Sequence, residues 1–404
     1  MLSKRQLFLD HVGQTGPMPV MIDVSHAKGM FIYDASGKRY LDMNSGISVS
    51  SLGHCHPAIL RAVLKQSESY MHTMVYGEHL QSPQVALASL LAKQLDSSLD
   101  AVYFVMSGTE ATEGAMKLAK RYTGRTEIIA CANAYHGSTH GAESLRSDEK
   151  YKQAFYPLLP DIRHITFNEL DDLSKITAKT SCVILEPVQA EAGVRLPNPD
   201  YLQALRKRCT KTGSLLILDE IQTGFGRTGQ LFAHQWQGIT PDILLLGKAM
   251  GGGMPIAAFV SSKEIMSSLT KNPMLGHITT FGGHPVCCAA AEACLRTLID
   301  EPQIIKEVAA KAKELKEYIE SFAIIKEVRH VGLMMAVEVT KRKYLKHIVA
   351  HCMELGLIID YFLFDDRSFR LAPPLIISAE EMELAKEIFE AAFRYAEEKY
   401  RRKK

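Results

Sequence analysis

The sequence predicts an α/β protein, with a mostly parallel sheet covered by helices and a smaller α+β domain built from both termini. Three observations predict this fold. Short apolar runs alternate with helical patterns through the middle of the chain, as expected for βαβ units. Most of these runs are continuously apolar, which is typical of strands buried on both faces. The two ends of the chain lack this rhythm and carry hairpin and helix patterns instead.

The central elements follow from the period of the apolar residues. Six apolar runs predict strands at residues 101–105, 127–130, 183–185, 215–218, 243–246 and 256–260. Helical patterns between them predict helices at residues 110–122, 200–210 and 264–268. Residues 60–290 therefore form the predicted large domain.

The ends of the chain form the predicted small domain, residues 1–59 and 291–404. Residues 31–42 read as a hairpin with its turn at residues 35–38. Helical patterns cover residues 301–321 and 380–399, with strand patterns at 334–339 and 357–359 between them. The basic residues 399–404 predict a solvated helix end or tail.

Composition excludes several classes of partner. A net charge of +2 gives no reason to expect nucleic acid or a membrane surface, and no apolar run approaches the roughly 20 residues that span a bilayer. The eight cysteines lack the spacing of a disulfide or zinc framework. His54-Cys55-His56 cannot turn all three side chains to one ion from an extended chain, so we expect no metal. A cytoplasmic protein is therefore expected.

Asp219 and Lys248 are the most informative residues. Each follows an apolar run, and the carboxyl ends of parallel strands meet at one edge of a sheet. Taken singly, each residue is more often a cap or an ion-pair partner. Together, an acid that holds a ring nitrogen protonated and a lysine that forms a Schiff base are what pyridoxal 5′-phosphate requires of a protein.

Ser107-Gly108-Thr109 lies between the first predicted strand and the first predicted helix. Free backbone N–H groups at a helix start, together with the helix dipole, favour a bound phosphate. An ordinary Ser/Thr helix cap is the commoner reading of such a turn alone. The spacing does not match a P-loop.

Three further segments carry side chains suited to a cofactor or substrate. Tyr135 and His136 follow the strand at 127–130, where an aromatic ring can stack on a flat cofactor with the histidine as support, although such a turn is more often structural. Thr280 lies in a second turn rich in hydroxyls and glycine. Arg370 precedes a rigid Pro-Pro and suits carboxylate recognition, although a lone arginine is usually a surface charge.

Together these residues resemble the class III aminotransferases of the ornithine, acetylornithine and 4-aminobutyrate type, which use pyridoxal phosphate on the fold type I scaffold. The resemblance runs from about residue 29 to about residue 377. Its most specific stretch is residues 218–229, followed by 241–243 and then Gly247-Lys248.

The resemblance implies roles around the cofactor ring. Lys248 would hold the cofactor as a Schiff base and move the proton between the substrate carbon and the cofactor. Asp219 would pair with the pyridine nitrogen, and Gln222 would lie near the phenolic oxygen of the ring. Ile221 would pack on one face of the ring, opposite Tyr135.

The resemblance also implies how phosphate and substrate are bound. Gly108 and Thr109 would bind the phosphate, and Thr280 would reach the phosphate in the neighbouring subunit, which implies a homodimer with shared active sites. Arg370 would bind the carboxylate of the 2-oxo acid or glutamate. Glu191 would pair with Arg370 when an ω-amine occupies the site.

Two positions bear on the donor. Ile47 resembles the acetylornithine branch, since ornithine aminotransferases typically carry a tyrosine there. Ser138 stands where both branches usually have an arginine that grips the distal carboxylate of the donor. Thr112, Ala190 and His284 also depart from the usual residues.

The expected activity is transfer of an ω-amino group from an acetylornithine- or ornithine-like donor to 2-oxoglutarate by a ping-pong mechanism. A 4-aminobutyrate or diamine aminotransferase is the alternative donor class, and an aminomutase or decarboxylase the alternative reaction. A non-catalytic nucleotide-binding α/β protein would leave Asp219 and Lys248 without a purpose.

Overall fold

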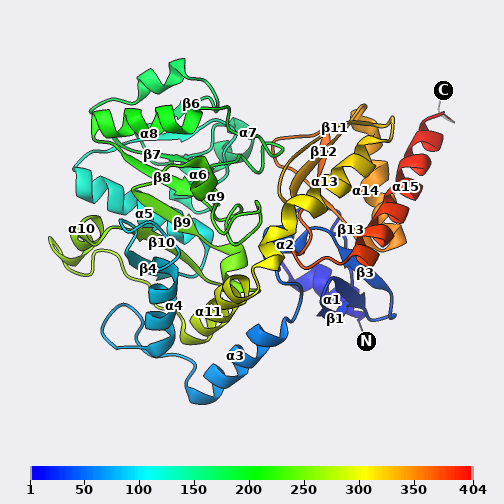
Figure 1. Cartoon of the computed structure of the whole chain (residues 1–404), viewed down its shortest axis with the longest axis horizontal. Helices are drawn as coiled ribbons and strands as arrows, with labels where there is room; N and C mark the ends of the chain where they lie inside the picture. Colours follow the sequence, from blue (N-terminus) through cyan, green and yellow to red (C-terminus); the bar gives the residue numbers. More distant parts are fainter. Residues whose placement is uncertain (1, 402–404) are drawn as a thin grey trace.

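The computed structural model describes residues 2–401 and divides into a large sheet with its helices and a smaller region built from both ends of the chain (Figure 1). Of the basic segment predicted as a tail, residues 402–404 lie outside the described part. Within residues 2–401, no helix is both long and apolar enough to cross a membrane.

The large sheet has seven strands in the order β4-β10-β9-β8-β7-β5-β6. Only β10 runs antiparallel to its neighbours, and the other pairings are parallel. The mostly parallel sheet and its six predicted strands are thus confirmed, while the polar edge strand β6 was missed. The strands are β4 (Ala101–Val105), β5 (Glu127–Cys131), β6 (Ile162–Ile165), β7 (Thr180–Leu185), β8 (Leu215–Asp219), β9 (Ile243–Leu246) and β10 (Ala257–Ser261).

Helices cover both faces of this sheet because alternate residues of each strand point to opposite sides. On one side, Ile217 and Phe259 share an apolar cluster with the buried face of α5 (Gly108–Thr123). On the other side, Leu218 packs in the cluster that contains the apolar residues of α8 (Tyr201–Thr212) and α11 (Pro285–Asp300).

Shorter helices complete the large part of the molecule. Next to α11 lie α3 (Pro57–Ser69) and α4 (Ser82–Ala92). The others are α6 (His140–Ser144), α7 (Glu149–Lys152), α9 (Ala233–Gln237) and α10 (Lys263–Met266). The helix predicted at 264–268 is α10 followed by a 3-10 turn, Ser267–Thr270.

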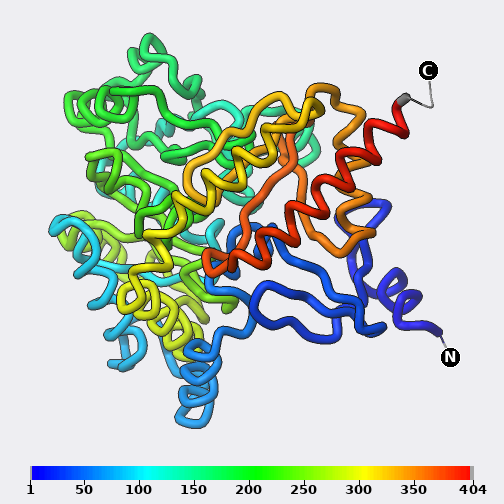
Figure 2. The backbone as a smooth tube through the Cα atoms, turned by 45° about the vertical axis from the view of Figure 1, so that its right-hand side comes forward, coloured from blue at the N-terminus to red at the C-terminus, as the bar shows by residue number. Residues whose placement is uncertain are grey.

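The remaining region contains two four-stranded sheets. One has the order β1-β2-β3-β13 and the other β11-β12-β15-β14. The pairing of β3 with β13 is parallel and joins the N-terminal hairpin to the C-terminal part of the chain, as Figure 2 shows from the position of the blue and orange segments. The strands are β1 (Val24–Lys28), β2 (Phe31–Asp34), β3 (Arg39–Asp42), β11 (Ile325–Val331), β12 (Met334–Val339), β13 (Leu357–Ile358), β14 (Asp360–Tyr361) and β15 (Ser368–Leu371).

The hairpin predicted at residues 31–42 is confirmed as β2 and β3. The helix predicted at 301–321 is two helices, so that prediction was wrong in its continuity. The predicted division near residue 290 falls inside α11 and stays a prediction.

The helices of the smaller region are α1 (Lys4–His11), α2 (Ser45–Ser48), α12 (Gln303–Lys306), α13 (Val308–Glu320), α14 (Arg342–Leu355) and α15 (Ala379–Arg401).

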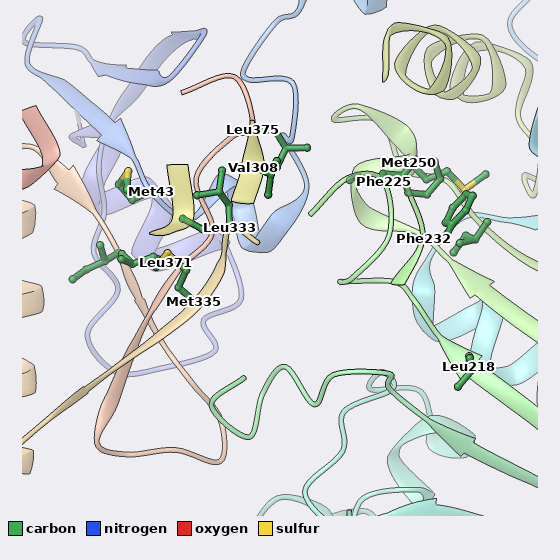
Figure 3. Close-up of a cluster of buried hydrophobic side chains, with 14 of the residues drawn as sticks. Met43, Leu218, Phe225, Phe232, Met250, Val308, Leu333, Met335, Leu371 and Leu375 are labelled. Atoms are coloured by element: carbon green, nitrogen blue, oxygen red, sulfur yellow. The ribbon is translucent and has the colours of Figure 1, made fainter. Parts of the chain in front are cut away.

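A continuous apolar core joins the two parts. Figure 3 shows Phe225 and Met250 on one side of this core and Met43 and Leu371 on the other. Arg227 crosses the junction with a side chain that is 0% exposed. Its guanidinium donates to the carbonyls of Leu333 and Pro373 and to Ser51 Oγ, and burial lowers its pKa to about 9.

We expect Arg227→Met to destabilise the fold by about 2–4 kcal/mol, because methionine fills the volume but leaves buried acceptors without a donor. The shift of the urea midpoint measures this. Lys263→Met is the control, since its side chain is 80% exposed and its loss should change stability by less than about 0.5 kcal/mol. Equal shifts for the two variants would contradict a structural role for Arg227.

Candidate active site

A cavity of about 810 Å³ lies at the carboxyl ends of the parallel strands. It collects residues from the large sheet, from the N-terminal segment and from β14 and β15. Of the site residues predicted from sequence, those lining it are Ile47, Gly108, Thr109, Tyr135, His136, Ser138, Glu191, Asp219, Ile221, Gln222, Lys248 and Arg370. Ser107 and Thr280 do not line it.

Asp219 ends β8 and is held by two donors. Its Oδ1 accepts from the backbone N–H of Ile221 at 2.9 Å, and its Oδ2 accepts from His136 Nδ1 at 2.7 Å. Burial lowers the pKa of His136, but the hydrogen bond and the negative charge of Asp219 outweigh it, so the net direction is upward. The carboxylate is thereby fixed in orientation at the base of the cavity.

Lys248 begins the segment after β9, with its backbone in the left-handed region at φ 47°. Its side chain reaches into the cavity, and burial lowers its pKa to about 8 against the opposing effect of the Glu191 carboxylate. A large fraction of the amine is therefore neutral slightly above neutral pH. A neutral lysine amine is a nucleophile.

The turn before α5 combines a helix cap with free backbone donors. Ser107 is the N-cap, and its Oγ accepts from the backbone N–H of Glu110 at 3.4 Å, so its side chain takes the ordinary capping role. Gly108 and Thr109 begin the helix, where N–H groups have no intrahelical acceptor. A Cβ on Gly108 would approach Ile221 Cδ1 to 2.8 Å, which explains the glycine. This end of the cavity suits an anion.

Glu191 and Arg370 form a buried ion pair across the cavity. The distance between Oε1 and the guanidinium is 2.6 Å, and the two side chains are 6% and 5% exposed. Gln222 donates to the same Oε1 at 3.0 Å, and the guanidinium stacks 4.7 Å from the ring centroid of Phe362. Burial raises the pKa of Glu191, but the charge of Arg370, the hydrogen bonds from Gln222 and Arg370 and the charge of Lys248 together outweigh burial, so the net direction is downward.

Ile47 lies in a strained turn at the cavity wall. Ser45, Gly46, Ile47 and Ser48 all have positive φ, a conformation that costs free energy at non-glycine residues. Asp42 holds the turn, because its Oδ1 accepts hydrogen bonds from the backbone N–H groups of residues 44 and 45. Such over-determined strain is typical of functional sites.

Ser138 and Tyr135 line the cavity near one another. The hydroxyl of Tyr135 lies 3.2 Å from Ser138 Oγ. Ser138 thus contributes a neutral hydroxyl where the resemblance places an arginine.

Sequence reasoning missed Glu186, which directly follows β7 and lines the cavity. It accepts from the backbone N–H groups of Tyr135 and Ala190, and burial raises its pKa to about 7. An acid after a buried strand is the same signal that revealed Asp219. Asp360, which follows the apolar run 357–359, carries this signal and was also missed. Thr15, Val188 and residues 361–363 also line the cavity and carried no such signal.

Thr280 lies outside the cavity of its own chain. It is exposed, and its carbonyl accepts from His72 Nε2 at 2.8 Å. Neighbouring apolar side chains are also exposed, with Ile278 at 50% and Phe281 at 47%.

A larger open cleft of about 1440 Å³ adjoins the cavity along Tyr361–Leu363. None of the site residues predicted from sequence lines this cleft, which is dominated by surface charges such as Lys341, Arg342 and Asp366. The chemistry described above belongs to the smaller cavity.

Residues 12–393 match the family of class III aminotransferases. The chain belongs to this family. An acetylornithine aminotransferase of Methanocaldococcus jannaschii is 39% identical over 92% of this chain and 93% of its own. The ornithine aminotransferase 1 of Staphylococcus aureus is 34% identical over 95% of this chain and 98% of its own. This class III chain is therefore a transaminase.

Solved structures agree with the family. An ornithine aminotransferase of Toxoplasma gondii, whose active site holds PLP at partial occupancy, superposes with a TM-score of 0.90 at 30% identity, covering 98% of this chain and 94% of its own. An (S)-enantioselective ω-transaminase of Thermomicrobium roseum superposes with a TM-score of 0.88 at 28% identity, covering 98% and 99%. This chain therefore has the α/β fold of PLP-dependent aminotransferases, known as fold type I.

We expect Lys248→Met to stabilise the ligand-free class III protein at pH 7 by roughly 2 kcal/mol, allowing for the partial exposure of the side chain. Below pH 8 the Lys248 side chain is a largely buried ammonium in the folded state, so the desolvation penalty on folding is fully present. Between pH 8 and 10.5 the unfolded chain binds more protons than the folded one, so wild-type stability rises. The difference between variant and wild type should therefore shrink.

Urea unfolding of both proteins across pH 7–10 measures this difference. Lys263→Met controls for the loss of one positive charge. A difference that stays constant or grows with pH would show that burial does not depress the pKa of Lys248.

Proposed function

We propose that this transaminase binds pyridoxal 5′-phosphate in the cavity and transfers an ω-amino group from an acetylornithine- or ornithine-like donor to 2-oxoglutarate by a ping-pong mechanism. One observation carries the proposal. The oriented carboxylate of Asp219 and the depressed-pKa amine of Lys248 line one cavity with the free N–H groups at the start of α5.

The residues present fit this cofactor. Asp219 and Lys248 supply the acid and the amine, and the start of α5 offers donors to a phosphate. Gly137 has φ 129°, and a Cβ there would lie 2.2 Å from Thr109 Oγ1, so the backbone approaches this end as closely as glycine allows. The aromatic ring of Tyr135 supplies a stacking surface.

When bound, the cofactor would supply an electron sink for the carbon that carries the amine. Asp219, held by His136, would keep a proton on the ring nitrogen and so maintain that sink. Lys248 would provide the covalent attachment through Nζ and then move the proton at the substrate carbon. Ile221 and Tyr135 would confine the ring, and Gln222 would hydrogen-bond its phenolic oxygen.

The Glu191–Arg370 pair supports two alternating substrates. With the pair closed, Arg370 is neutralised and the cavity accepts an amine without an adjacent carboxylate. A 2-oxo acid would take Arg370 from Glu191 through its carboxylate, for which guanidinium geometry is well matched. This exchange argues for an aminotransferase over an aminomutase or a decarboxylase, which needs no second substrate.

The relatives named acetylornithine and ornithine aminotransferase support the donor class. Ile47, which lines the cavity, supports the acetylornithine branch. The neutral Ser138 favours a second candidate, a diamine donor, because it offers no cation to the distal carboxylate that acetylornithine, ornithine and 4-aminobutyrate all carry.

We also propose a homodimer with shared sites, in which Thr280 serves the partner's phosphate. The exposure of Thr280, with its apolar neighbours, supports this. Seven of the eight free cysteines are buried, which agrees with a reducing, cytoplasmic location. The partners would be small molecules, with no nucleic acid or membrane.

The purified protein should be yellow, and Lys248→Ala should lose the absorbance of covalently attached cofactor and at least about a thousandfold in glutamate formation from 2-oxoglutarate and an amine. Absorbance spectra and a glutamate assay measure the two effects. Lys263→Ala is the matched control and should keep both. A protein that takes up no pyridoxal phosphate would refute the proposal.

We expect Lys248→Ala and Thr280→Asp chains to complement each other when mixed. Each homodimer should be nearly inactive, the second because its carboxylate repels the cofactor phosphate. Random re-pairing through unfolding and refolding yields hybrids with one intact site, so activity should recover to about a quarter of wild type. If Thr280 serves its own chain's site, the mixture stays inactive.

A further inference from the structure

Asp360 places a carboxylate in the cavity that the proposed mechanism does not use. It belongs to β14, which pairs antiparallel with β15, and Asp360 lies directly opposite Arg370 in the register. Directly opposite side chains of an antiparallel pair project from the same face of the sheet. Both residues line the cavity.

The charge at this wall is unbalanced. Arg370 is paired with Glu191 at 2.6 Å. Asp360 accepts from the backbone N–H of Tyr361 at 2.8 Å and from Asn44 Nδ2 at 3.4 Å, both neutral donors, and within residues 2–401 it forms no ion pair. Two carboxylates therefore face one guanidinium, which leaves a net negative charge.

The rest of the cavity does not neutralise this charge for a donor. Lys248 and His136 lie at the end assigned to the cofactor, and Ser138 is uncharged. The apolar side chains of Ile47 and Phe362 also line the cavity. Away from the cofactor end, the cavity thus offers apolar side chains and the Asp360 carboxylate, and its cation, Arg370, is already paired with Glu191.

We propose that the amine donor is an α,ω-diamine whose distal ammonium binds Asp360. This inference rests on the proposed aminotransferase reaction and selects the second donor candidate, a diamine, over an acetylornithine- or ornithine-like donor. The amine near Lys248 reacts: its carbon is oxidised to an aldehyde, the carbonyl carbon of 2-oxoglutarate is reduced, and the nitrogen passes from one to the other through the cofactor. The products are an amino aldehyde and glutamate, and the atoms balance.

Donors of matched length test the proposal on the holoenzyme with 2-oxoglutarate as acceptor. These are 1,5-diaminopentane, hexylamine and 5-aminopentanoate, which have chains of equal length that end in a cationic, neutral or anionic group, and N-acetylornithine is added. Glutamate formation gives kcat/KM for each. We expect the diamine to exceed the other three by about tenfold or more, the size of one charge-assisted hydrogen bond.

Two variants assign the effect to the wall. Asp360→Asn should lower the ratio of kcat/KM for the diamine to that for hexylamine by about tenfold, whereas Asp366→Asn should leave this ratio unchanged. Asp366 is a fair control, because it lies on the same segment and its exposed carboxylate pairs with Arg342 at 3.1 Å. Ser138→Arg adds a cation to the cavity and should shift the preference toward 5-aminopentanoate.

The outcomes separate the two claims. If N-acetylornithine or 5-aminopentanoate is the best donor, or if Asp360→Asn leaves the ratio intact, the diamine inference is overturned while the aminotransferase stands. If Asp360→Asn does not fold, the wild-type donor order and the Ser138→Arg shift decide. If no amine yields glutamate, the proposed function itself fails.

Discussion

The buried hydrogen bond between Asp219 and His136 is the interaction around which the site is organised. A carboxylate removed from water costs several kcal/mol unless partners satisfy it, and here one oxygen accepts from His136 and the other from the backbone of Ile221. His136 follows β5 and Asp219 ends β8, so the bond crosses β7 between them. Because the carboxyl ends of these parallel strands meet at one edge, two residues far apart in sequence satisfy each other there.

A second constraint comes from the ends of the chain, which close the cavity that the large sheet leaves open. Arg370 on β15 reaches Glu191 on the loop after β7, and the buried Arg227 ties Leu333 and Ser51 to the same junction. The strained turn at Ile47 is held by Asp42 at the end of β3. The contacts of Arg370 and Arg227 join residues from separate parts of the molecule, so the substrate side of the cavity depends on how the two parts pack.

The contrast between strand ends of the large sheet and contacts between the two parts explains which site residues could be predicted from the sequence. Asp219 and Lys248 were predictable because each follows an apolar run whose period identifies a buried strand, and Glu186 carries the same signal although it was missed. Asp360 also follows an apolar run, residues 357–359, but its place opposite Arg370 depends on the long-range pairing of the two-residue strand β14. The edge strand β6 was missed because Arg163 and His164 interrupt its apolar pattern. The proposed position of Thr280 beside a second subunit depends on an interface between chains, which no local pattern predicts.

The same contrast bears on specificity. The cofactor end is built from strand ends that local patterns reveal, and its chemistry is common to the family. The donor end is built from long-range pairs, where one residue can invert the charge: Ser138 removes a cation and Asp360 leaves a carboxylate beside a guanidinium that Glu191 has already neutralised. An amine with an anionic end would enter this region against a net negative charge, and an amine with a cationic end would neutralise it. The proposed donor therefore rests on the balance of charge at a wall that only the folded chain assembles.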